Sequence, residues 1–180
     1  MGYSVELHFD EESEDIIKRY WKILYDGKGG KFMHIHGKKP HISLALYYQE
    51  MEHIDTLKEL VVSNFENMEK FKLHFASVGV FPGNDRVTFL NPKPSPKLLS
   101  IQNKLYSDIR KHKIKKYYWG HYKPKVWTPH CTMIVNEDIE TNSIGIDLLT
   151  KIFEPFEVTV EKVALVEFYP YKCLLEMELL

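Results

Sequence analysis

The chain has 180 residues, of which 44% are apolar and 27% charged, and its formal net charge is -1. This length fits one domain spanning residues 1–180, and the composition excludes a disordered chain. No apolar run reaches the roughly 18 residues that a membrane span needs, and near-neutral charge argues against proteins that wrap long duplex nucleic acid. The start lacks the pattern of a signal peptide, and two cysteines are too few for a disulfide framework or a four-cysteine zinc site, so we expect a cytoplasmic protein.

Hydrophobic periodicity predicts the elements of the first half of the chain. Alternation indicates strands, and apolar residues three or four positions apart indicate helices. We expect strands at residues 3–9, 41–48 and 71–81, helices at 10–25 and 54–65, and a basic loop at 31–40. The first strand, with Tyr3, Val5, Leu7 and Phe9 on one face, is expected to be half-buried. A turn at residues 82–85 and a return strand at 86–90 form a hairpin, and residues 91–95 break the pattern.

The second half continues with a similar mixture. We expect helices at residues 98–109 and, more weakly, at 144–153, and strands at 130–135, 156–169 and 173–179. Helices connect strands, but hairpins also occur. The fold class is therefore α+β with largely antiparallel sheets.

One short motif occurs in both halves. Lys39-Pro40-His41-Ile42-Ser43-Leu44 matches Thr128-Pro129-His130-Cys131-Thr132-Met133, and both read Pro-His-apolar-hydroxyl-apolar. Side chains alternate along a strand. Each motif should therefore present an imidazole and a hydroxyl on one face, and apolar side chains on the other.

Two such strands facing a cleft would suit a phosphoester. Imidazoles titrate near neutrality, so one can accept a proton while the other donates one. Ser43 and Thr132 can bind the non-bridging phosphate oxygens and align the ester. No metal is required if the two imidazoles supply the proton transfers.

These paired motifs resemble the two His-x-Ser/Thr-x motifs of the 2H phosphoesterase superfamily, and within it the bacterial 2′-5′ RNA ligase-like and RNA 2′,3′-cyclic phosphodiesterase group. The resemblance covers nearly the whole chain. It implies two pseudo-symmetric lobes, with mainly antiparallel sheets facing a central cleft and helices outside. It also implies that His41 and His130 are catalytic, that Ser43 and Thr132 bind phosphate, and that no cofactor is used. We assign His130 as the base and His41 as the acid.

Other residues have two readings each. Cys131 should be buried and inert. The His34-x-His36 pair could hold zinc, but no carboxylate nearby looks like a third ligand, so no metal site is predicted. The segment from Lys111 to Lys125 holds no acid and interleaves Lys with aromatics, which suits RNA, although lysines are also favoured at a helix C-terminus.

Three further side chains are weaker candidates. Lys39 could contact substrate from the rim of the first motif. Tyr171 stands where relatives often have an aromatic that lines the cleft, but it could equally be a strand-end tyrosine. Arg86, in the hairpin, could reach a phosphate, but the sequence does not say which face it uses.

The sequence therefore predicts a metal-independent, monomeric phosphoesterase. It would hydrolyse 2′,3′-cyclic phosphates at an RNA 3′ end or on a cyclic nucleotide to 2′-phosphomonoesters, with reversible 2′-5′ ligation through the same residues. Another activity of the superfamily, on an ADP-ribose cyclic phosphate or a 2′-5′ oligonucleotide, is an alternative. So is a non-catalytic module that binds RNA ends or nucleotides.

Overall fold

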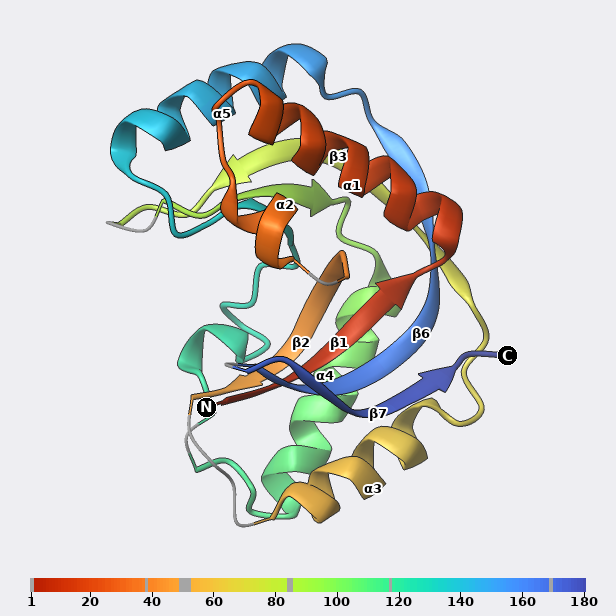
Figure 1. Ribbon diagram of the computed structural model, residues 1–180. Helices are drawn as coiled ribbons and strands as arrows, with labels where there is room; N and C mark the ends of the chain where they lie inside the picture. Colours follow the sequence, from red (N-terminus) through yellow and green to blue (C-terminus); the bar gives the residue numbers. More distant parts are fainter. Residues whose placement is uncertain (1, 38, 49–52, 84–85, 117, 169) are drawn as a thin grey trace.

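The computed structural model describes residues 2–37, 39–48, 53–83, 86–116, 118–168 and 170–180 (Figure 1). Within these ranges the elements, in chain order, are β1 (Gly2–Phe9), α1 (Glu11–Asp26), α2 (Phe32–His36), β2 (His41–Tyr47), α3 (Ile54–Phe65), β3 (Phe71–Val80), β4 (Thr88–Pro92), α4 (Pro96–Lys111), the 3-10 helix η1 (Gly120–Tyr122), β5 (Cys131–Ile134), α5 (Ile139–Ile152), β6 (Phe156–Phe168) and β7 (Lys172–Glu178). The predicted α+β class is confirmed.

One strand joins the two halves of the sheet. The seven strands form an antiparallel sheet in the order β2-β1-β6-β3-β4-β5, with β7 also paired to β6. Residues 156–160 of β6 pair with β3, whereas residues 160–168 pair with β1. Since β6 has 13 residues, it is long enough to serve both halves. The result is two four-stranded halves, β2-β1-β6-β7 and β6-β3-β4-β5, which continue into each other through β6.

The helices lie outside these two halves. Figure 1 shows α1, α2 and α5 beside β3, β4 and the first part of β6, and α3 and α4 beside β1, β2 and β7. The helices α1 and α4 each bury an apolar stripe of helical spacing. The stripe of α4 consists of Leu98, Ile101, Leu105 and Ile109. No helix in the described ranges is long and apolar enough to cross a membrane.

Several predicted boundaries differ from the structure, and three of the differences follow from particular contacts. Residues 32–36 form a helical turn rather than a loop, because the Glu137 carboxylate accepts hydrogen bonds from the backbone N–H groups of Lys31 and Phe32. Strand β4 continues through Pro92, where it pairs with β3. Helix α5 begins five residues early because Asp138 caps it, accepting from the backbone N–H of Thr141.

The prediction of a half-buried first strand is also wrong. All eight residues of β1 are buried, because β1 lies between β2 and β6. Its apolar alternate residues enter the core as expected. The opposite face carries Ser4, Glu6 and His8, all of them buried. A polar row is therefore enclosed beside the first motif.

Candidate active site

The two motif strands occupy opposite ends of the sheet order and are brought together in space. β2 and β5 are the terminal strands of the two halves. The backbone N–H of His41 nevertheless hydrogen-bonds the Cys131 thiol, and the charge of His41 acts on His130. The structure thus brings the two predicted histidines close together.

The two imidazoles are held in the same way. Nδ1 of His41 lies 2.8 Å from the carbonyl oxygen of Lys39, and Nδ1 of His130 lies 2.8 Å from the carbonyl oxygen of Thr128. A carbonyl oxygen only accepts, so each Nδ1 carries a proton. Nε2 of each ring is then left for proton exchange with a substrate.

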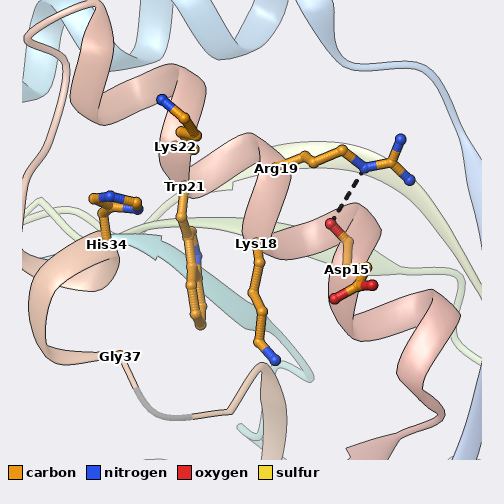
Figure 2. A pocket seen from close by; sticks show the side chains of 7 residues that line it. All are labelled: Asp15, Lys18, Arg19, Trp21, Lys22, His34 and Gly37. Atoms are coloured by element: carbon orange, nitrogen blue, oxygen red, sulfur yellow. Dashed lines mark hydrogen bonds between the residues drawn. The ribbon is translucent and has the colours of Figure 1, made fainter.

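A tryptophan supports each motif strand. The Trp127 indole N–H donates to the carbonyl oxygen of Ser43 at 3.2 Å, and the Trp21 indole N–H donates to that of Thr132 at 3.1 Å. Figure 2 shows the Trp21 ring hanging from α1 beside the segment that bears His34. Both indoles are buried and thus fix the residue whose hydroxyl is predicted to bind phosphate.

The two hydroxyls differ in their surroundings. Ser43 is buried, and its Oγ accepts a hydrogen bond from Ser4 Oγ at 3.0 Å. The buried phenol of Tyr122 also interacts with the Ser43 hydroxyl. Thr132 is half-exposed. Both hydroxyls follow their histidine by two residues on the same face of the strand, as the alternation predicts, while Ile42 and Cys131 enter the core.

His130 lies in an aromatic environment. Its ring centroid is 4.9 Å from that of Phe81 and 5.3 Å from that of Phe89. Burial lowers the pKa of His130, the charge of His41 lowers it further, and the bond to Thr128 opposes this only in part. The neutral imidazole, which can accept a proton at Nε2, is therefore favoured.

His41 instead faces a carboxylate. Its Nε2 lies 3.5 Å from Glu6 Oε1, and the Glu6 side chain is only 7% exposed. Burial acts to raise the pKa of Glu6, but the charge of His41 and the hydrogen bond from His8 lower it overall. Glu6 is thus ionised and lies where it can offset positive charge on the His41 ring.

The carboxylate belongs to a chain of ionisable side chains. His8 is fully buried, with Nε2 3.0 Å from Glu6 Oε2 and Nδ1 3.3 Å from Glu176 Oε2. The hydrogen bond of Lys39 lowers the pKa of Glu176 despite partial burial, so both carboxylates are ionised. The His8 ring thus bridges the two carboxylates, one at each ring nitrogen. The order from the surface is Lys39, Glu176, His8, Glu6 and His41.

The three weaker candidates, Lys39, Tyr171 and Arg86, lie in different surroundings. The Lys39 Nζ is 2.7 Å from Glu176 and therefore engaged in an ion pair. Tyr171 is 40% exposed, and burial together with the charge of Glu6 raises its pKa to about 12, so it lies near this network. Arg86, with φ of 37°, accepts from Asn142 Nδ2 and Thr88 Oγ1 at its carbonyl oxygen.

The candidate metal residues do not converge. His34 packs on Tyr25 and His36 on Phe32, at ring distances of 4.7 and 5.0 Å. In the ranges that the structure describes, no three His, Cys, Asp or Glu side chains are placed to hold a metal ion. Cys131 is buried, which raises the pKa of its thiol to about 12.

Sequence reasoning missed Glu6, His8 and Glu176. The alternation of Ser4, Glu6 and His8 in the first strand is visible in the sequence, but alternation alone predicts a solvent face for them. These polar residues point to the site only once the pairing of β1 with β2 is known. In that pairing Glu6 lies next to Ser43 and His8 next to His41 on the neighbouring strand.

Comparison with known families decides where the chain belongs. The model of the 2′-5′ RNA ligase superfamily matches residues 9–170. The chain belongs to this superfamily of 2H phosphoesterases. No curated protein sequence matches this chain significantly.

Solved structures show the same fold at low sequence identity. This 2′-5′ RNA ligase superfamily member is 18% identical to TT0787 of Thermus thermophilus, with a TM-score of 0.68 and coverage of 99% of this chain and 98% of that one. It is 15% identical to E. coli LigT in complex with 3′-AMP, with a TM-score of 0.65 and coverage of 98% and 96%. A structure described only as a phosphoesterase is 15% identical, with a TM-score of 0.64 and coverage of 99% and 98%.

Proposed function

We propose that this protein hydrolyses 2′,3′-cyclic phosphates, at RNA 3′ ends or on nucleotides, to 2′-phosphomonoesters. The observation that carries the proposal is the matched pair of histidines, each with Nδ1 bonded to the carbonyl oxygen two residues earlier. The E. coli LigT structures contain ATP and 3′-AMP, which supports a nucleotide or RNA-end substrate for the same fold.

The difference between the two histidines assigns their roles. His130, whose pKa is lowered by burial, accepts a proton from water as the water oxygen attacks phosphorus. The bond from phosphorus to O3′ breaks, and His41, with Glu6 as its counter-ion, donates the Nε2 proton to O3′. Ser43 and Thr132 bind the non-bridging oxygens. The phosphate stays on O2′, and the two histidines exchange protonation states.

Ligation would use the same groups. A 5′-hydroxyl in place of water would attack phosphorus, with His130 accepting its proton; the bond from phosphorus to O3′ breaks, His41 protonates O3′, and a 2′-5′ bond forms. Attack of the 3′-hydroxyl on that 2′-5′ bond is the reverse of this step. Because water is in vast excess, we take hydrolysis as the physiological direction. Proton transfer by two imidazoles requires no metal in this scheme.

The experiment is a product assay with cyclic nucleotides in the presence of a chelator. We expect a 2′-phosphomonoester from the wild type, and losses of at least about 10³-fold in His41→Ala and His130→Ala, since positioned acid–base groups contribute about 10²–10⁴-fold each. His34→Ala, a histidine outside the site, is the matched control. Full activity in either site variant, or a 3′-phosphomonoester product, would contradict the proposed mechanism.

A further inference from the structure

A concave surface lies outside the candidate active site. It has a volume of about 810 Å³ and runs between α4 and the turn that follows η1. One wall is a single face of α4, and the other is the turn at residues 123–126. The α4 wall consists of Asn103, Tyr106, Ser107, Arg110 and Lys111. This surface is called the α4 groove below.

The α4 groove is strongly basic in a protein whose net charge is -1. Arg110, Lys111, Lys123 and Lys125 line it, and the sequence has no Asp or Glu from residue 109 to 136. Lys111 is paired with Asp108. The other three form no ion pair with any described residue. The helix dipole accounts for cations at the end of α4, but not for Lys123 and Lys125 on the opposite wall.

The α4 groove also offers surfaces on which bases can stack. The Arg110 guanidinium lies 6.0 Å from the centre of the Tyr106 ring, which in turn packs against Tyr118 at 5.4 Å. Val126 is 58% exposed on the other wall. Cations that track a phosphate backbone, together with aromatic and apolar faces for bases, are the features of single-strand binding grooves.

Hydrogen bonds link the walls of the α4 groove to the candidate active site. The carbonyl oxygen of Lys123 accepts from the backbone N–H groups of Val126 and Trp127, which forms the turn, and Trp127 supports Ser43. Gln102 of α4 donates to the carbonyl oxygen of Tyr122, which joins the two walls. Lys125 and His130 are five residues apart, so they lie within about 18 Å. At the ~3.4 Å spacing of stacked nucleotides, at most about five nucleotides span that distance.

We propose that the α4 groove binds the single-stranded RNA upstream of the terminal phosphate that the cleft holds. The inference that the bound RNA is the strand upstream of the reacting phosphate rests on the proposed function. The inference that the α4 groove binds RNA does not. It follows that an oligonucleotide of six or more residues is bound more tightly than a mononucleotide, while the rate of the chemical step is the same for both.

The pocket of Figure 2, between α1 and the segment around Gly37, is a natural comparison. It is smaller, at about 490 Å³, and also contains cations. Its charges are largely compensated. Lys18 is paired with Glu14 and Lys22 with Asp26, while Arg19 donates to the backbone carbonyl oxygen of Asp15, whose carboxylate lies on the same wall. The α4 groove, with its unpaired cations, is the better site for a polyanion.

The test uses a 12-nucleotide RNA with an ordinary 3′-hydroxyl, so that binding is measured without turnover. In fluorescence anisotropy, Arg110→Glu/Lys125→Glu should weaken binding at least tenfold and reduce the salt slope by about 1.4, since each phosphate contact contributes about 0.7 on a single strand. Turnover of a cyclic mononucleotide should stay at the wild-type rate. The matched control is Arg19→Glu/Lys93→Glu, which reverses two exposed cations elsewhere.

Each result decides the proposal. Unchanged RNA affinity in Arg110→Glu/Lys125→Glu, or an equal loss in the control variant, would overturn it. The proposal would also be overturned if the wild type bound the 12-nucleotide RNA no more tightly than a dinucleotide while still binding a polyglutamate peptide, which is a polyanion without bases. If no cyclic phosphate is hydrolysed but RNA binding depends on the α4 groove, the proposed function fails while this inference stands.

Discussion

The sharpest prediction concerns Glu6, which sequence analysis overlooked. Its carboxylate lies 3.0 Å from Nε2 of His8 and 3.5 Å from Nε2 of His41. Glu6→Gln is nearly isosteric and keeps a hydrogen-bond acceptor for His8. It removes the negative charge that faces both His41 and His8, so it tests electrostatics with little change in packing.

The magnitude follows from the distance. Two unit charges 3.5 Å apart interact by about 5 kcal/mol at an effective dielectric constant of about 20. His41 is 30% exposed, and His8 shares the same carboxylate. Because solvent screens the pair and His8 also contacts the carboxylate, the net interaction energy between Glu6 and His41 is reduced to about 1–2 kcal/mol. Since 1.36 kcal/mol corresponds to one pH unit, the alkaline limb of the activity profile should move down by about one unit.

The assay is kcat/KM for a cyclic nucleotide from pH 5 to pH 9. In the proposed mechanism His41 acts as the acid, so Glu6→Gln should lose about tenfold at alkaline pH and much less at acid pH. Glu161→Gln is the matched control, because it removes a carboxylate of β6 that is paired with Lys70 instead of a histidine. An unshifted profile, or an equal loss at every pH, would refute the electrostatic role and leave only a structural one.

Two further predictions concern the supports of the site. Trp127→Phe leaves the buried carbonyl oxygen of Ser43 without its hydrogen-bond donor. The free energy of unfolding in urea should therefore fall by about 1–2 kcal/mol, and KM should rise. Trp119→Phe is the control and should change both quantities little. The lowered pKa of Glu6 means that the folded state binds its proton less tightly than the unfolded state, so Glu6 stabilises the fold above about pH 4.5 and this contribution is lost as the pH falls through the folded pKa. Urea unfolding should therefore show a steeper decline below pH 4.5 for the wild type than for Glu6→Gln, and parallel curves would contradict this.

Much of the fold could be predicted because its signals are local. The strand that starts at Phe156 and the helix from Ile54 to Phe65 begin at the predicted residues, since alternation and helical spacing depend only on neighbours in sequence. The helical turn at residues 32–36 was missed because Glu137, more than 100 residues away, accepts its first N–H groups. A distant cap of this kind leaves no mark in the local pattern.

The candidate site divides in the same way. His41, Ser43, His130 and Thr132 could be predicted because each pair lies on one strand, two residues apart. The polar network beside them could not, because it joins four segments: β1, the residue before the first motif's proline, β2 and β7. Strand pairing determines that Glu6 lies next to the motif, and a single sequence without a fold gives no register.

The asymmetry between the two histidines can be traced to one pair of equivalent positions. β1 pairs with β2 as β4 pairs with β5, and the residue opposite the motif hydroxyl is Glu6 in the first case and Phe89 in the second. Backbone bonds hold His41 and His130 alike, but one ring meets a carboxylate and the other a phenyl ring. A repeated motif with identical surroundings would give two groups of equal acidity and no preferred direction of proton transfer. In the proposed mechanism, this difference in the neighbouring strands favours His41 as the acid and His130 as the base.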